Sequence, residues 1–133
     1  KLDSEYGGVF FYGAHMIQPL MYIFGDDIKK VRINDNGKNS SASLIYENGM
    51  LATLISSTQK YGWETHIETK DGILKLKATK DYKEKIPKNY LDMVTMFKTG
   101  VEPRSYSSIL SGVSVLESLE RSVNSGQWED VIK

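Results

Sequence analysis

The residue best suited to proton chemistry is a histidine in an apolar segment near the start of the chain. The segment GVFFYGAHMIQPLMYIF, residues 8–24, has few polar side chains, and His15 is one of them. An imidazole titrates near neutral pH, so it can give or take a proton as a general acid or base. A polar ring in an apolar helix needs a hydrogen-bond partner or a water-filled cleft. His15 is therefore either a satisfied core histidine or a catalytic candidate.

Three neighbours of His15 in the sequence share its side of the predicted helix. Phe11 lies four residues before the histidine, Tyr12 three before it and Gln18 three after it. Side chains at these spacings face the same way on a helix. Core packing is the simpler explanation of the aromatic residues, and we accept it for Phe10. Together with His15, however, Tyr12 and Gln18 make a polar patch that favours a binding cleft, so Phe11, Tyr12 and Gln18 are predicted to bind substrate.

Other catalytic and metal-binding signatures are missing from the sequence. The chain contains no cysteine, which excludes disulfides and thiolate metal sites. Its second histidine, His66, belongs to an alternating strand segment and is interpreted as a surface residue, so no metal site is predicted. No glycine-rich dinucleotide or P-loop motif occurs, nor any G-x-S-x-G nucleophile elbow. No cofactor-binding residue is therefore assigned, and we expect this chain alone to bind neither NAD nor NADP.

Composition indicates an ordinary soluble globular protein. The 133 residues are 40% hydrophobic and 26% charged, with a formal net charge of zero. This balance gives no support to a nucleic-acid or membrane partner, since both need a basic surplus. The lack of cysteine fits a reducing compartment, and we expect a cytoplasmic protein. The chain starts at Lys1 and runs directly into an apolar segment, so we interpret it as a piece of something longer.

Periodicity predicts a helix, then strands, then two helices. The helix over 8–24 should be buried, with a kink or restart near Gln18 caused by Pro19, and Gly25 ends it. Turn dipeptides at Asn36-Gly37, Asn48-Gly49 and Asp71-Gly72 separate short strands. These strands are expected at Ile28–Asn34, Ser43–Tyr46, Leu51–Ile55, Trp63–Thr69 and Ile73–Lys77.

The closing segments carry apolar positions at helical spacing. The first helix places Tyr90, Val94 and Phe97 on one face, with Gly100 as its C-cap. The second starts at Ser105 or Ser107, ends at Asn124-Ser125-Gly126, and leads to a last short strand in GQWEDVI. This order predicts an α+β fold in which helices pack on one face of a largely antiparallel, mixed sheet.

Four segments, taken together, resemble the strand-rich half of the Gfo/Idh/MocA oxidoreductases. These are GGVFFYGAHMIQPLMYIFG, ASLIYENGMLATLISS, ETHIETKDGILKL and FKTGVEPRSYSSILSGVSVLESLERSVNSGQWEDV. They occur in the family's order and cover nearly the whole chain. The resemblance implies a C-terminal domain like that of dihydrodipicolinate reductase, spanning residues 1–133 as one substrate and oligomerisation domain. It also implies an N-terminal Rossmann domain that is absent here, together with the lysine of the family's E-K-P motif.

The match to the family's catalytic motif, D-x-G-x-H-x-x-D, is partial. Gly13 and His15 stand at its glycine and histidine, but Phe11 and Gln18 replace its two carboxylates. In the family the histidine resembles a general acid/base or a ligand of the substrate hydroxyl, oriented by the first carboxylate. The departure puts ordinary alcohol dehydrogenation in doubt. Substrate binding, altered chemistry and lost activity all remain open.

Three hypotheses about function follow. The first is an NAD(P)-dependent oxidoreductase acting on a sugar-like or cyclitol-like small molecule, with the N-terminal domain as intramolecular partner. The second is a catalytically inactive relative that works as a binding or assembly subunit. The third is an unrelated α+β interaction domain. By the family resemblance we also expect a homo-oligomer, formed through the open face of the sheet, to which some of Leu44, Tyr46, Leu51 and Ile55 contribute.

Overall fold

The computed structural model describes residues 5–57, 64–77 and 88–132. Contacts divide the chain into two compact units, residues 1–58 with 104–133 and residues 59–103. Trp63, predicted to start a strand, lies outside the described residues.

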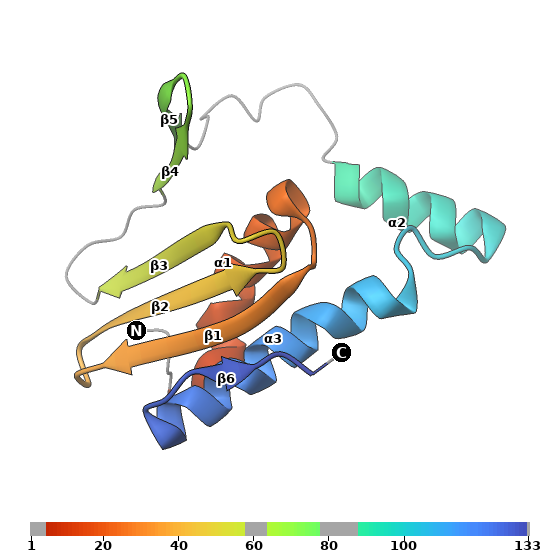
Figure 1. Ribbon diagram of the computed structural model, residues 1–133. Coiled ribbons are helices and arrows are strands. Elements are labelled where there is room, and N and C mark those ends of the chain that lie inside the picture. Colours follow the sequence, from red (N-terminus) through yellow and green to blue (C-terminus); the bar gives the residue numbers. More distant parts are fainter. Residues whose placement is uncertain (1–4, 58–63, 78–87, 133) are drawn as a thin grey trace. The chain divides into compact units, whose positions relative to one another are not determined.

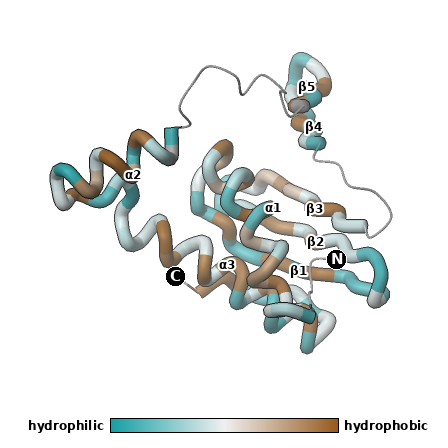
Figure 2. Tube along the Cα trace, turned by 180° about the vertical axis from the view of Figure 1, so that it is seen from behind, coloured by the Kyte–Doolittle hydropathy of each residue, from teal (hydrophilic) through white to brown (hydrophobic). Residues whose placement is uncertain are grey.

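The first unit is a four-stranded antiparallel sheet covered on one face by two helices (Figures 1 and 2). The strand order is β3-β2-β1-β6, and every pairing in this sheet is antiparallel. The predicted α+β fold, with helices on one sheet face, is confirmed. The elements are α1 (Gly8–Phe24), β1 (Ile28–Asp35), β2 (Asn39–Tyr46), β3 (Leu51–Ser57), α3 (Tyr106–Ser125) and β6 (Glu129–Asp130).

The turns between β1, β2 and β3 form at the two predicted Asn-Gly pairs. The Asn36 side-chain oxygen accepts the backbone N–H of Lys38 and Asn39, at 3.1 and 2.8 Å. Gly37 and Gly49 have φ angles of 82° and 84°, which a side chain would disfavour. These local bonds set the register that turns every second residue of β2 toward the helices.

Alternation along β2 decides which residues form the core. Ala42, Leu44 and Tyr46 are buried against the helix layer, whereas the intervening side chains lie on the opposite face of the sheet. The open face carries Leu51 and Ile55 of β3, which are 73% and 74% exposed. Some of Leu44, Tyr46, Leu51 and Ile55 were expected to reach that face; Leu51 and Ile55 do, whereas Leu44 and Tyr46 point into the core. The core is completed by Val9, Ile17, Met21, Ile28, Val31, Ile33, Leu54, Val115, Leu116 and Leu119.

Helix α1 has the predicted bounds and continues through Pro19 as a single element, so no restart occurs near Gln18. The expectation of a buried helix is wrong. Only Val9, Gly13, Ile17 and Met21 are buried, because α1 packs on the sheet layer and α3 along one side only.

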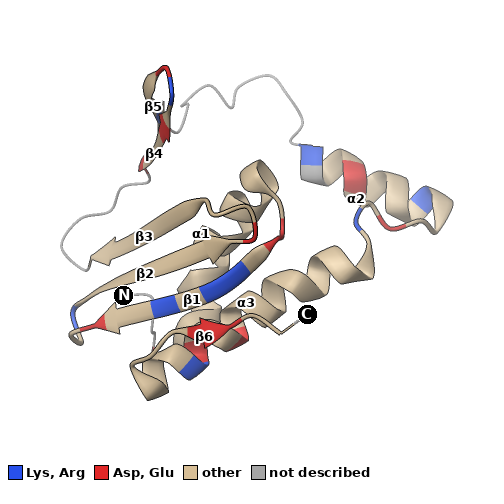
Figure 3. Cartoon of the chain, viewed as in Figure 1, with Lys and Arg blue, Asp and Glu red and all other residues tan. Residues whose placement is uncertain are grey.

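Short strand β6 is attached to both its neighbours by charged and hydroxyl groups. Arg121 of α3 donates to the backbone carbonyl of Asp130 at 2.6 Å and to Glu129 at 3.4 Å. Lys30 of β1 pairs with the Asp130 carboxylate at 3.3 Å. Figure 3 shows this basic stretch of β1 beside acidic β6. The buried hydroxyl of Ser118 also donates to the Asp130 carbonyl, at 3.2 Å.

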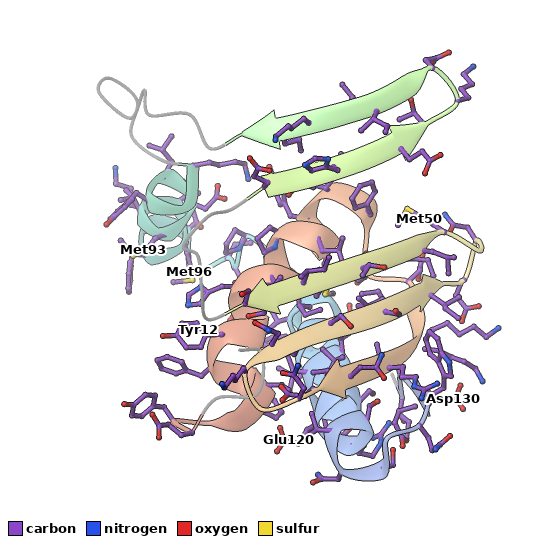
Figure 4. All side chains as sticks on the ribbon, turned by 90° about the vertical axis from the view of Figure 1, so that its left-hand side faces the viewer. Tyr12, Met50, Met93, Met96, Glu120 and Asp130 are labelled. Atoms are coloured by element: carbon purple, nitrogen blue, oxygen red, sulfur yellow. The ribbon has the colours of Figure 1, made fainter. Side chains whose placement is uncertain are left out.

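The second unit contains the hairpin β4 (Glu64–Thr69) with β5 (Gly72–Lys77), and helix α2 (Lys88–Thr99). The hairpin turns at the predicted Asp71-Gly72, where Gly72 has a φ of 126°. Helix α2 ends as predicted at Gly100, whose N–H donates to the Met96 carbonyl at 2.8 Å. The predicted apolar face of α2 is exposed in the described structure, at Tyr90, Val94 and Phe97. Figure 4 labels two further α2 side chains, Met93 and Met96.

Helix α3 also has the predicted ends. Ser105 is the N-cap, in an extended backbone conformation, and its hydroxyl accepts the Ser108 N–H at 3.2 Å. Gly126 adopts a left-handed conformation as C-cap. The same stretch positions Ser118 and Ser122, two fully buried serines, against the edge of the sheet.

Candidate functional site

The four predicted site residues all lie on the outer face of α1. Its inner face is defined by Val9, Gly13, Ile17 and Met21, at four-residue spacing. Phe11, Tyr12, His15 and Gln18 point away from that face, and each is exposed. At about 100° per residue, His15 stands near the middle of the outer face. The sequence prediction that these side chains share one side of the helix is consistent with this arrangement.

Aromatic rings cluster at the N-terminal end of the outer face. The rings of Phe11 and Tyr12 meet edge to face, with centroids 4.8 Å apart and planes at 88°. Tyr6 adds a third ring, 5.9 Å from Phe11. Phe11 and Tyr12 remain 48% and 41% exposed, and Tyr12 projects outward from α1 (Figure 4). The cluster therefore offers an apolar surface one turn away from the imidazole.

His15 has no hydrogen bond or ion pair to any of the described residues, and its side chain is exposed. The interpretation of His15 as a satisfied core histidine is therefore wrong for this chain. No carboxylate stands one turn before it, because position 11 holds a phenylalanine. A ring with both nitrogens free of protein partners can exchange a proton with a bound hydroxyl, but nothing on α1 fixes its orientation.

Two residues around this face were missed by the sequence argument. Tyr22, one turn beyond Gln18, is 80% exposed and continues the outer stripe of α1. Its spacing from Gln18 is the same four-residue step that relates Phe11 to His15, so periodicity could have found it. Glu120 of α3 contacts the start of α1 through the Val9 N–H, at 3.4 Å. No local pattern could reveal that contact, since 111 residues separate the two partners.

The helix N-termini of the first unit do not fit the phosphates of a dinucleotide. Such phosphates bind free backbone N–H groups at a helix start. The start of α1 already holds the Glu120 carboxylate, and the start of α3 is capped by Ser105. No group of His, Asp or Glu suited to a metal ion occurs among the described residues. None of the described helices has both the length and the apolarity to cross a bilayer.

His66, the other histidine, lies on the charged face of the β4–β5 hairpin, exposed as predicted. Its Nε2 lies 3.5 Å from the Glu64 carboxylate, which Lys75 approaches to 2.9 Å. The hydrogen bond from Lys75, followed by that from His66, lowers the pKa of Glu64 below its ordinary value. These exposed side chains form a cross-strand ion-pair network, an arrangement common on sheet surfaces.

Solved structures share this fold, although no protein-family profile and no curated protein matches the sequence. A candidate myo-inositol dehydrogenase from Sinorhizobium meliloti 1021 is 14% identical, with a TM-score of 0.61 over 90% of this chain and 48% of its own. An NAD-binding protein from Listeria innocua is 13% identical, with a TM-score of 0.62 over 92% and 51%. A probable dehydrogenase from Thermotoga maritima is 15% identical, with a TM-score of 0.57 over 90% and 49%.

These matches show the fold of the chain. The chain spans about half the length of each of these proteins, and nearly all of it takes part in the match. The fold implied by the Gfo/Idh/MocA resemblance is thereby confirmed.

Proposed function

We propose that this chain is the substrate-binding C-terminal part of an NAD(P)-dependent oxidoreductase of the Gfo/Idh/MocA type, acting on a sugar-like or cyclitol-like substrate. The parent carries a nucleotide-binding domain that precedes residues 1–133, which form one substrate and oligomerisation domain. One observation carries the proposal. In a fold that makes up about half of dehydrogenase-like proteins, the outer face of α1 presents an exposed imidazole between aromatic rings and an amide.

Each residue on this face has a role that suits a polyhydroxylated ring. The rings of Phe11 and Tyr12 would pack against the C–H face of the substrate, as aromatic side chains pack against apolar surface. The Gln18 amide can both donate and accept hydrogen bonds to hydroxyls. His15 would take the proton of the reacting hydroxyl or return it.

The cofactor belongs to the part of the parent that this chain does not contain. The start of α1 is occupied by a carboxylate and the start of α3 by a serine hydroxyl, so neither suits a pyrophosphate. When bound in the parent, the nicotinamide would supply the redox equivalent. We expect isothermal titration of the 133-residue chain with NAD or NADP to give no heat of binding; a micromolar affinity would contradict this division of roles.

The proposal is tested with the full-length protein and a panel of cyclitols and sugars starting from myo-inositol. Absorbance of the reduced cofactor reports turnover with NAD⁺ or NADP⁺. We expect turnover on at least one member of the panel. Gln18→Ala should raise the KM for that substrate several-fold. The control is His66→Ala, an exposed residue of the second unit, and it should leave KM unchanged.

A catalytically inactive binding or assembly subunit is the second candidate. It is favoured by the lack of any partner that would orient His15 among the described residues. In that case the panel yields binding without turnover. Phe11→Asp tests the difference, since it places a carboxylate one helical turn before His15. Because position 11 is about half exposed, the new charge need not be buried, and a gain of turnover would identify the missing carboxylate as the cause.

Assembly and location complete the proposal. We expect a cytoplasmic homo-oligomer that pairs through the open face of the sheet. Leu51 and Ile55 project from this face with about three quarters of their surface exposed, and apolar side chains in that state gain by burial. A symmetric pairing would bring two copies of the same patch together.

A further inference from the structure

Helix α1 begins without a capping side chain of its own. Its N-cap residue is Gly7, which has no side chain to accept the first free N–H groups. The Glu120 carboxylate of α3 lies at this point instead, and its Oε2 accepts the backbone N–H of Val9 at 3.4 Å. Figure 4 labels Glu120 on α3. Val9 is the second residue of the helix, the position whose N–H a capping group usually receives.

Gly8 leaves the room that this carboxylate occupies. A Cβ at position 8 would lie 2.7 Å from Oε2 and 3.2 Å from Oε1 of Glu120. Gly8 also has a φ of +58°, a conformation that other residues rarely adopt. A side chain here would strain the backbone and push the carboxylate away from Val9. The glycine and the glutamate, far apart in the sequence, thus form one contact.

We infer that the Glu120 side chain of α3 caps the start of α1, where the N-cap residue Gly7 has no side chain, and that Glu120 is the positioning residue for the aromatic end of the candidate site. A carboxylate near a helix start accepts unpaired N–H groups and is attracted by the helix dipole. Phe11 and Tyr12 stand in the first turns of α1, the part that frays when a cap is lost. The positioning role rests on the proposed function of this face, whereas the cap itself does not.

The Glu120 contact supports only one end of the candidate site. His15 lies further along the helix, between the buried anchors Gly13 and Ile17. Those anchors hold the imidazole end to the core whether or not the first turn is formed. Loss of Glu120 should therefore disturb the rings of Phe11 and Tyr12 and leave the surroundings of His15 unchanged.

Amide hydrogen exchange, followed by NMR on the 133-residue chain, tests the cap. In Glu120→Ala we expect the Phe11 and Tyr12 amides to exchange at least about fivefold faster, the size that loss of a typical N-cap gives. The cross-peak between the two rings should weaken. Amides beyond Ile17 should keep their protection. Glu120→Gln, which retains an acceptor oxygen of the same reach, should restore part of the protection.

Glu117→Ala is the matched control, because Glu117 is a glutamate on the same helix that pairs with Arg121 and not with α1. It should leave the exchange of Phe11 and Tyr12 within about twofold of the parent. A double-mutant cycle with Gly8→Ala should show coupling, since both changes act on one contact. If Glu120→Ala does not fold, Glu120→Asp replaces it, because it shortens the side chain by only one methylene. We then expect the same amides to exchange faster, by a smaller factor.

Unchanged exchange and ring contacts in Glu120→Ala, or equal changes in Glu117→Ala, would overturn the inference. In a full-length protein that turns over substrate, Glu120→Ala should raise KM while kcat stays within about twofold; a fall in kcat at constant KM contradicts the positioning role. If no substrate is turned over but the Phe11 amide exchanges faster in Glu120→Ala, the proposed function is wrong and the capping role of Glu120 is supported.

Discussion

Ser122→Ala should destabilise the first unit far more than its small change in volume suggests. Ser122 is fully buried, and its hydroxyl accepts the buried backbone N–H of Ile33 at 3.0 Å. The same hydroxyl donates to the Gln127 carbonyl at 2.6 Å. Strand β6 pairs with β1 only at Lys30 and Val31. At Ile33 the Ser122 hydroxyl therefore accepts the backbone N–H that a neighbouring strand would otherwise accept.

The magnitude follows from these two bonds. A buried donor left without a partner costs about 1–3 kcal/mol, and a lost hydrogen bond about 1 kcal/mol more. We therefore expect the free energy of unfolding to fall by about 2–4 kcal/mol. For a domain of this size that corresponds to a melting temperature lower by roughly 8–16 °C, at about 4 °C per kcal/mol.

Urea unfolding followed by circular dichroism measures this loss directly. Ser111→Ala is the matched control, since the Ser111 hydroxyl donates only to the Ser107 carbonyl of its own helix, at 2.8 Å. We expect the control to change the free energy of unfolding by no more than about 0.5 kcal/mol. If the two variants lose equal stability, the hydroxyl of Ser122 does not serve the edge of β1 as described.

Three further outcomes are expected. Tyr46→Phe should leave the free energy of unfolding unchanged or raise it by up to about 1 kcal/mol in thermal melts. The reason is that the Tyr46 hydroxyl is buried without a partner among the described residues, and burial raises its pKa to about 12. A loss of stability above about 1 kcal/mol would show that the hydroxyl has a partner. The Glu64 carboxyl should titrate below its ordinary value in an NMR pH series, and Lys75→Ala should move its pKa upward. Because the folded pKa is the lower one, the hairpin gains stability above the ordinary pKa and loses it as pH falls through the lowered value. Leu51→Lys with Ile55→Lys should shift any oligomer toward monomer in light scattering without unfolding the chain, as both side chains are exposed; an unchanged assembly would exclude the open sheet face as the interface.

Local signals in the sequence predicted most of the elements. Asn36-Gly37 forms its turn through the Asn36 side chain, and Ser105 caps α3, because these bonds involve residues within three positions of each other. Such contacts are fully determined by neighbouring residues, so the sequence carries them. The bounds of α1 followed in the same way from Gly25.

Contacts between distant segments were beyond the same reasoning. Glu120 meets Val9 across 111 positions and Ser122 meets Ile33 across 89, and neither pair leaves a periodic signal. The burial of α1 was overestimated for a related reason. A helix that is apolar on every side does not reveal which side contacts the sheet. Phe10, which was assigned to core packing, is therefore 41% exposed.

The sequence predicted which side of α1 the candidate residues share, but not what surrounds them. Helical spacing placed Phe11, Tyr12, His15 and Gln18 on one side, and the structure shows all four exposed there. Spacing could not show that His15 is free of partners or that a carboxylate from α3 stands at the start of the helix. Those features depend on how α1 and α3 pack.

The turnover of His15→Ala in the full-length protein tests the central claim most directly. Since the ring is exposed and makes no contact that its removal would break among the described residues, the substitution should leave the melting temperature unchanged. General acid–base help of this kind is worth about 10²–10⁴ in rate. We therefore predict that kcat for cofactor reduction falls at least about tenfold in His15→Ala and stays unchanged in His66→Ala. Equal turnover in His15→Ala and the parent protein would contradict the assignment of this face as the catalytic site.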